Sequence, residues 1–301
     1  MRVHKKNRKK ISLLLFLPVF VLLVFMLFLI LFKTSTWDGR EKFILAVNGQ
    51  DDVLVSVFDP KTETIVGVSI PSNVQITAAG ELGTWKLGSL WKLGQNEKRE
   101  GNLLAKTVTK NFGFPVYAWG DYQAAGFTRR KLSEILPAIF GNYKTSLKTG
   151  DRIRLGLFVL GVGPAKRTSI NLAEVNESLK KETFLDGSEG YVIRGNVPDR
   201  IMALFSDEVV AAKNYKARFV LNAERIKSIE AVSRVVEVMG VKVASVVKDS
   251  PEDMNCLVKG EDRKLVKSVA LVLGCTGQEK KKVEGNFDIE IAFGEQFNKN
   301  F

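Results

Sequence analysis

Histidine is almost absent from this sequence. The only one, His4, lies in the N-terminal tail, so residues 5–301 contain no imidazole. Imidazole is the usual base beside a serine or cysteine nucleophile and is a frequent metal ligand. Beyond the tail, the sequence therefore excludes a Ser–His or Cys–His catalytic pair and any metal centre that depends on histidine.

Cysteine is also scarce. Cys256 and Cys275 are the only two, too few for a four-cysteine zinc site. In an oxidising compartment they can form a disulfide, and otherwise they can remain buried thiols that pack as small hydrophobic side chains. The sequence leaves both alternatives open.

Nucleotide- and nucleic-acid-binding motifs are missing too. Residues 161–164 (GVGP) lack the Lys-Ser/Thr that completes a phosphate-binding loop, and Pro164 removes a backbone donor. The net charge of +12 overstates the basic character, because six of the 45 basic residues lie in the first ten positions. The mildly basic remainder suits anionic lipids, phosphate-bearing polymers or peptidoglycan acids, and we expect no nucleic-acid partner.

One long apolar run stands out near the N-terminus. Residues 11–32 carry no charged side chain, and as a helix rising about 1.5 Å per residue they would span a hydrocarbon core of about 30 Å. The run is longer than the apolar region of a signal peptide and ends without a small-residue cleavage site. The basic tail, residues 1–10, predicts a cytoplasmic N-terminus. We therefore expect a single-pass protein of the cell membrane whose bulk is extracytoplasmic.

The remainder divides into two predicted domains. Residues 40–197 interleave strand and helix patterns, which favours a layered α/β (α+β) domain. Strands are predicted at 42–47, 53–58, 64–70 and 151–160, and helices at 102–111, 129–140 and 171–181.

A connecting segment, residues 198–216, leads to a second domain at residues 217–297. Its strand and helix patterns follow the order β-α-β-β-α-β, which is typical of a small ferredoxin-like fold. Residues 298–301 are expected to be frayed.

Asp51 and Asp52 are the best candidates for catalysis by residue type. They lie at the start of a predicted strand, and Mg²⁺ usually takes one or two carboxylates together with substrate phosphates. Adjacent side chains on a strand point in opposite directions, however, so a charged turn is the simpler interpretation.

Residues 51–73 (DDVLVSVFDPKTETIVGVSIPSN) resemble the opening of the LytR-CpsA-Psr family domain. There a strand, an Asn-Pro-Lys-Thr-like turn and a strand ending in Ser-Ile-Pro-Arg-Asp recur. Residues 86–91 (KLGSLW), 185–187 (LDG) and 191–194 (YVIR) continue the likeness. Residues 220–222 and 288–294 are similar to parts of the LytR C-terminal domain.

The resemblance implies transfer of a glycopolymer from a polyprenyl-pyrophosphate carrier to peptidoglycan, with arginines on the pyrophosphate and acids on Mg²⁺. Asp51 matches a metal-binding acid and Arg194 a later arginine, while Arg200 and Lys86 can supply further positive charge to a phosphate. The family's other positions differ, because Gly49 and Ser72 replace arginines and Asn73 replaces an acid.

Three functions follow from this comparison. The leading hypothesis is a non-catalytic protein, with no cofactor, that binds peptidoglycan or a lipid-linked glycopolymer and organises the cell envelope. The first alternative is an active Mg²⁺-dependent phosphotransferase. The second is a structural module that docks another envelope protein.

Overall fold

The computed structural model describes residues 35–129, 131–221, 229–249 and 254–301, together with positions 18 and 26. The predicted cytoplasmic tail and almost all of the predicted anchor, residues 11–32, lie outside this part. Within it, no helix is both long and apolar enough to cross a membrane.

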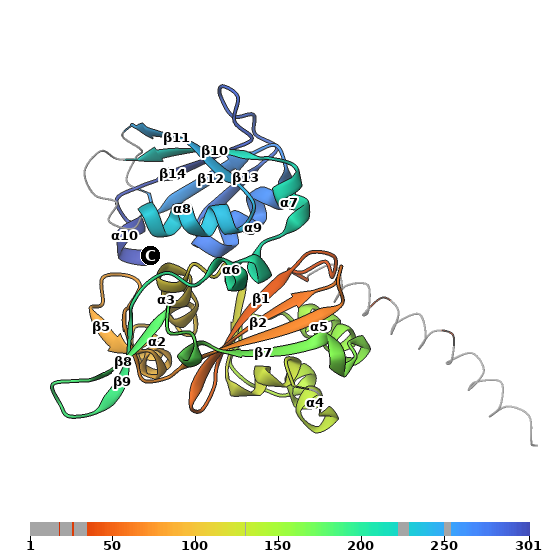
Figure 1. Ribbon diagram of the computed structural model, residues 1–301. Helices are drawn as coiled ribbons and strands as arrows, with labels where there is room; N and C mark the ends of the chain where they lie inside the picture. The colour runs from red at the N-terminus through yellow and green to blue at the C-terminus, as the bar shows by residue number, and fades with distance from the viewer. Residues whose placement is uncertain (1–17, 19–25, 27–34, 130, 222–228, 250–253) are drawn as a thin grey trace, which may run out of the picture.

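A five-stranded sheet forms the centre of the first domain, in the order β6-β1-β2-β3-β7 (Figure 1). The strands β1 (Phe43–Asn48), β2 (Asp52–Asp59) and β3 (Thr64–Pro71) are antiparallel neighbours and confirm the three N-terminal strands predicted from the sequence. The edge strands β6 (Ala118–Gly120) and β7 (Arg167–Asn171) pair in parallel with β1 and β3.

Both faces of this sheet are buried, which explains its almost continuous apolar strands. Ile44 and Ala46 point into a core that includes α2 (Leu90–Asn96) and α3 (Asn102–Phe112). Phe43 and Leu45, on the opposite face, join a second core that includes α4 (Leu132–Phe140) and α5 (Thr149–Gly161). The domain is therefore a layered α/β structure, as predicted.

Two predicted elements of the first domain are wrong. Residues 151–160 were expected as a strand but belong to the helix α5, where Leu155 and Val159, four residues apart, are buried and Leu157 is exposed. Their alternating pattern also satisfies one face of a helix. Asn171 was expected to cap a long helix. Its side chain does accept a hydrogen bond from the Ala173 amide, but the helical turn that follows spans only Leu172–Glu174. The strand β8 (Leu179–Thr183) begins soon after.

A smaller sheet completes the first domain, in the order β5-β4-β9-β8. Its strands β5 (Thr84–Lys86), β4 (Val74–Thr77) and β9 (Glu189–Ile193) come from distant parts of the chain. The helices α6 (Asp199–Phe205) and α7 (Glu208–Ala212) then lead to the second domain.

The second domain is not ferredoxin-like. Its sheet has the order β11-β10-β14-β12-β13, with two βαβ units on either side of β14 (Ile289–Phe293). One unit is β10 (Lys216–Leu221), α8 (Ile229–Val238) and β11 (Lys242–Lys248). The other is β12 (Cys256–Gly260), α9 (Arg263–Leu273) and β13 (Thr276–Glu279). In each unit the two parallel strands are direct neighbours, whereas the predicted split pattern requires a strand between them. The strand β13 was also not predicted from the sequence.

The C-terminal residues are packed rather than frayed. The short helix α10 (Phe297–Asn300) and Phe301 follow β14, and both Phe297 and Phe301 are fully buried. Their rings continue a series of aromatic contacts that begins with Phe219 and Phe293.

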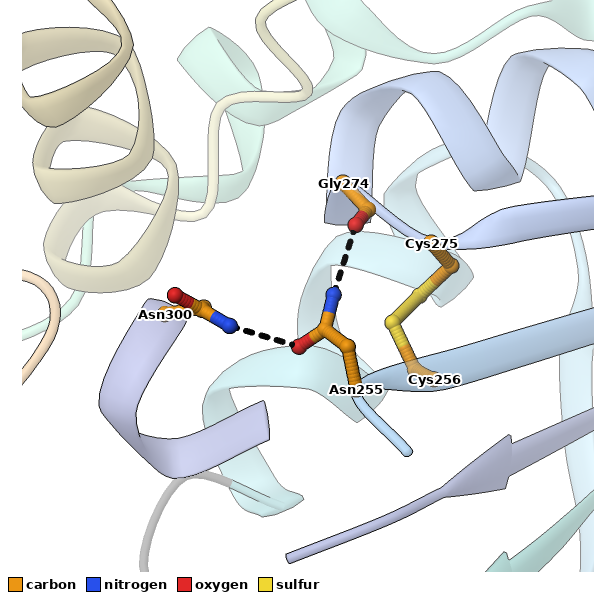
Figure 2. Close-up of a disulfide and its surroundings, with 5 residues drawn as sticks. All are labelled: Asn255, Cys256, Gly274, Cys275 and Asn300. Carbon is orange, nitrogen blue, oxygen red and sulfur yellow. Dashed lines mark hydrogen bonds between the residues drawn. A yellow bond between two sulfur atoms is a disulfide. The ribbon is translucent and has the colours of Figure 1, made fainter. Parts of the chain in front are cut away.

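The two cysteines form a disulfide, which decides between the two alternatives left open above. Cys256 at the start of β12 is bonded to Cys275 just after α9 (Figure 2). The bond closes the second βαβ unit on the side that faces α10.

Candidate functional site

Asp51 and Asp52 lie in an open cavity of about 830 Å³ at one side of the first sheet. We call this cavity the sheet-edge groove. Its lining comes from the start of β2, the middle of β3, the edge strand β7 and the segment that precedes α4; the residues are 49–52, Leu54, Ile65, Gly67, Ser69, Tyr122, Ala125, Thr128, Arg129, 167–169 and Asn171.

The two aspartates differ in how strongly they are held. Asp51 is exposed, and its backbone carbonyl accepts a hydrogen bond of 3.2 Å from the amide of Ser72. Asp52 is half-buried, and its carboxylate accepts a short hydrogen bond from the hydroxyl of Ser69. They are the only acids among the described residues that line the groove. Oxygen ligands of this kind suit Mg²⁺, although substrate phosphates would have to complete its coordination.

One of the two arginines in the described lining of the groove, Arg167, donates hydrogen bonds to the backbone. It reaches the carbonyls of Thr128 and Arg129, both at 3.2 Å, and those of Val159 and Val162 at the end of α5. These bonds hold the segment before α4 against α5. The guanidinium is thus used to fix the wall, not to present a fork of donors to a ligand.

The other groove arginine, Arg129, is exposed and lies 3.7 Å from a carboxylate oxygen of Glu134. An exposed pair of this kind contributes little to stability. Among the described residues, the groove lining therefore contains one arginine that faces backbone carbonyls and one in an exposed ion pair.

The backbone at Gly49 leaves no room for the arginine that the family resemblance places there. A Cβ atom at this position would lie 2.4 Å from the Oδ1 atom of Asp52 and 2.6 Å from its backbone oxygen. Similarly, a Cβ atom at Gly88 would lie 2.7 Å from that of Ser72. The turns near Asp51 therefore leave no space for a side chain at positions 49 and 88.

Lys86 lies on the smaller sheet, away from the sheet-edge groove. Its ammonium is 3.0 Å from the hydroxyl of Ser188, 3.8 Å from a carboxylate oxygen of Asp186 and 5.7 Å from the centre of the Phe184 ring. The hydrogen bonds from Ser188, together with the charge of Lys86, lower the pKa of Asp186. Lys86 lines a second, shallow cavity of about 420 Å³ at this turn.

The two predicted arginines also lie outside the groove lining. Arg194 follows β9 and is exposed, with its backbone amide bonded to the carbonyl of Ser178 at 2.9 Å. Arg200 is exposed on α6, 3.4 Å from a carboxylate oxygen of Glu177. Of the four predicted site residues, only Asp51 lines the groove. Arg167 was missed because the edge strand that it begins has no apolar periodicity.

No protein-family model matches the chain, and no curated protein matches it. Among solved structures, the chain is similar to proteins of the LytR-CpsA-Psr family. TagT of Bacillus subtilis is 16% identical, covers 54% of this chain and 88% of its own, and has a TM-score of 0.39. A structure of the family protein YwtF (TagT) with bound octaprenyl pyrophosphate lipid is 15% identical and has a TM-score of 0.37. The match covers 54% of this chain and 87% of that chain. Lin1025 of Listeria innocua is 10% identical and has a TM-score of 0.37, and the match covers 54% of this chain and 93% of that chain.

Proposed function

We propose that this chain is a non-catalytic cell-envelope protein that binds peptidoglycan or a lipid-linked glycopolymer. The motif at residues 51–73 supports a ligand of this class. The sheet-edge groove supports the absence of transfer, because its fixed arginine faces backbone carbonyls. A leaving pyrophosphate develops negative charge that a fixed set of cations must stabilise in a transferase. The described residues of the groove lining offer no such set.

The protein is held in the membrane by residues 11–32 and displays its two domains outside the cytoplasm. The disulfide between Cys256 and Cys275 supports this location, since disulfides persist in oxidising compartments. The smaller groups of charge at Lys86, Arg194 and Arg200 then contribute to binding an anionic polymer along the surface.

Binding is tested by native mass spectrometry of the purified full chain after incubation with polyprenyl phosphate, polyprenyl pyrophosphate or soluble peptidoglycan fragments. Thr168→Trp fills the groove from the exposed edge strand β7, and Lys180→Trp is the matched control on the exposed edge strand β8. We expect one ligand class to be retained by the parent and by Lys180→Trp but not by Thr168→Trp. Retention of none of these ligands would contradict the proposal.

The transferase alternative keeps one observation in its favour, which is that Asp51 and Asp52 line the same groove. It predicts Mg²⁺-dependent release of phosphate or pyrophosphate from the bound polyprenyl carrier, and loss of that release in Asp51→Ala. A phosphate-release assay on the same preparations separates the two functions, since a non-catalytic binder retains the carrier unchanged with or without Mg²⁺.

A further inference from the structure

A third cavity, distinct from the sheet-edge groove and from the shallow cavity at Lys86, lies between the two domains. It has a volume of about 420 Å³, and we call it the interdomain cleft. The first domain lines it with α3 and the preceding loop, and the second domain with the end of α9 and with α10. Figure 2 shows the second-domain wall, where Asn255 links Gly274 to Asn300 beside the disulfide.

Among the described residues, the lining of the interdomain cleft carries three cations, Lys98, Arg99 and Lys106, and no acid. Within the described part of the chain, neither lysine forms an ion pair, and Arg99 donates to the backbone carbonyl of Lys299 at 2.9 Å. Burial, followed by the nearby charge of Arg99, lowers the pKa of Lys106. Like charges gathered in a partly desolvated cavity are unfavourable unless an anion compensates them.

A buried hydroxyl in the same cavity also lacks a partner. Thr109 lines the interdomain cleft and is 1% exposed, and its Oγ1 atom has no hydrogen-bond partner among the described residues. A buried polar group without a partner destabilises the folded state. Nearby, the Oδ1 atom of Asn102 accepts from the Trp119 ring at 3.0 Å, which orients its amide. A ligand with several acceptor oxygens would satisfy these donors.

We propose that the interdomain cleft binds a phosphate-bearing anion, through Lys98, Arg99, Lys106 and Thr109. A phosphate or pyrophosphate group presents several acceptor oxygens at once, which matches ammonium, guanidinium and hydroxyl donors better than a single carboxylate does. The phosphate can belong to a small molecule or to a polymer. This site shares no residue with the sheet-edge groove and does not depend on the function proposed for it.

The disulfide stabilises the wall opposite Lys106. A Cβ atom at Gly274 would lie 2.7 Å from the Lys106 ammonium, so this glycine leaves the space that the cation occupies. The carbonyl of Gly274 accepts from the Asn255 amide at 2.9 Å, and the residues that follow each of them, Cys275 and Cys256, are bonded together. An intact disulfide therefore keeps this wall of the cleft in place.

Calorimetric titration of the purified full chain tests the proposal, with pyrophosphate in one arm and a soluble polyol-phosphate polymer in the other. We expect saturable binding that weakens at least tenfold in Lys106→Met and several-fold in Lys98→Met. Lys98 is an exposed loop residue, so its variant keeps the test valid if Lys106→Met does not fold. Lys92→Met, an exposed lysine on α2 outside the cleft lining, is the matched control and should bind like the parent.

Binding in both arms assigns a site for phosphate groups in general, and binding of the polymer alone assigns the polymer as the source. The proposal is overturned if the parent binds neither, or if the Lys98 and Lys106 variants bind as tightly as the Lys92 control. The groove-filling variant Thr168→Trp should bind pyrophosphate normally, which separates this site from the proposed envelope ligand.

A different observation concerns the outer surface of α4 and α5. Leu132, Leu136 and Phe140 follow one another at intervals of four residues along α4, and their exposed fractions are 59%, 51% and 72%. On α5, which packs beside it, Leu157 and Leu160 are also exposed. Soluble monomers rarely expose apolar surface arranged in this way.

The helix α5, which carries part of this surface, begins where the chain enters the first domain. The amides of Thr36 and Trp37 donate to the Asp151 carboxylate in the first turn of α5, at 2.7 and 2.8 Å. The apolar run at residues 11–32 ends only a few positions earlier. We infer that the α4–α5 surface lies on the lipid bilayer, an inference that rests on the membrane attachment proposed above.

A polarity-sensitive fluorophore on a single introduced cysteine tests this contact in the full chain reconstituted in nanodiscs. The label at Phe140→Cys should report an apolar environment and be quenched by brominated lipids, whereas the label at exposed Lys280→Cys should remain in water. Equal, water-like signals at both positions would refute the bilayer contact. Failure of the chain to enter nanodiscs at all would instead refute the membrane attachment, and the contact with it.

Discussion

At the scale of single residues, Asp151 is the side chain on which the start of the first domain depends most. It is 1% exposed, and its carboxylate accepts from the Ser35 hydroxyl, from the amides of Thr36 and Trp37, and from the Lys148 amide at 3.3 Å. We expect Asp151→Ala to lower the free energy of unfolding by about 3 kcal/mol, because it leaves buried donors without an acceptor. Urea denaturation of the fragment 34–301 measures this. Asp151→Asn, which keeps one acceptor oxygen, should lower the free energy of unfolding by less. Equal losses of stability in the two variants would show that the charge matters more than the acceptors.

Asp262 makes a comparable set of bonds at the surface of the second domain. Burial raises its pKa, but hydrogen bonds from Tyr215, Lys213 and the first turn of α9 outweigh this and bring the pKa to about 2. The depressed value means that the ionised carboxylate stabilises the fold above its ordinary pKa of 3.8, and that this stability is lost as the pH falls towards 2.

We therefore expect Asp262→Ala to remove a helix cap worth about 1 kcal/mol at neutral pH. In the same variant, stability should fall less steeply as the pH is lowered from about 4 to about 2. Thermal unfolding of parent and variant across this pH range measures both effects. If the difference in stability between parent and variant stays constant down to about pH 2, Asp262 does not titrate in this interval.

At the scale of whole elements, the contact between α4 and α5 depends on the absence of a side chain at Gly156. A Cβ atom there would lie 2.1 Å from the Cδ1 atom of Ile139. Gly156→Ala should cost about 1–3 kcal/mol through overpacking, and Ile139→Val should recover part of it in the double variant. Gly161→Ala is the matched control on the same helix, since nothing lies within 4 Å of its Cβ position. Denaturant unfolding of the four variants tests the coupling, which is refuted if the double variant is purely additive.

The same helix shows where prediction from the sequence succeeds and where it fails. The first three strands are predictable, because turn residues at 48–52 and 59–62 separate apolar segments of strand length. Residues 151–160 are ambiguous, because an apolar residue at every second position also places some residues four apart. Asp151 near the start of α5 and Ile139 beside Gly156 decide the outcome, and both act through contacts with distant parts of the chain.

The candidate site was harder to predict than the fold. Asp51 could be chosen from its position at the start of a strand, and it does line the sheet-edge groove. Lys86, Arg194 and Arg200 were placed by resemblance alone, and a linear motif does not specify which sheet carries each residue. Arg167 had no signal, because its role comes from carbonyls at the end of α5 and before α4, which only the tertiary structure brings together.

At the scale of the whole molecule, Tyr117 is the side chain common to all three hydrophobic cores. It packs against both cores of the first domain and the core of the second, and it is stacked on Phe43 with ring centres 6.0 Å apart. Burial, with the nearby charges of Asp207 and Glu41, raises its pKa. The ring is therefore neutral at physiological pH and joins the domains by packing.

Tyr117→Ala should consequently weaken the coupling between the domains as well as the cores themselves. We expect a loss of about 3 kcal/mol or more and a calorimetric transition that divides into two, because each domain would then unfold with less support from the other. Tyr117→Phe keeps the ring and should retain one transition.

The surface contacts of Lys264 with Asp38 and Glu41, at 2.9 and 3.2 Å, also cross this boundary, but exposed ion pairs contribute little. Lys264→Ala should therefore leave the single transition intact, and a divided transition in that variant would show that ionic contacts, not the packing of the Tyr117 ring, couple the domains.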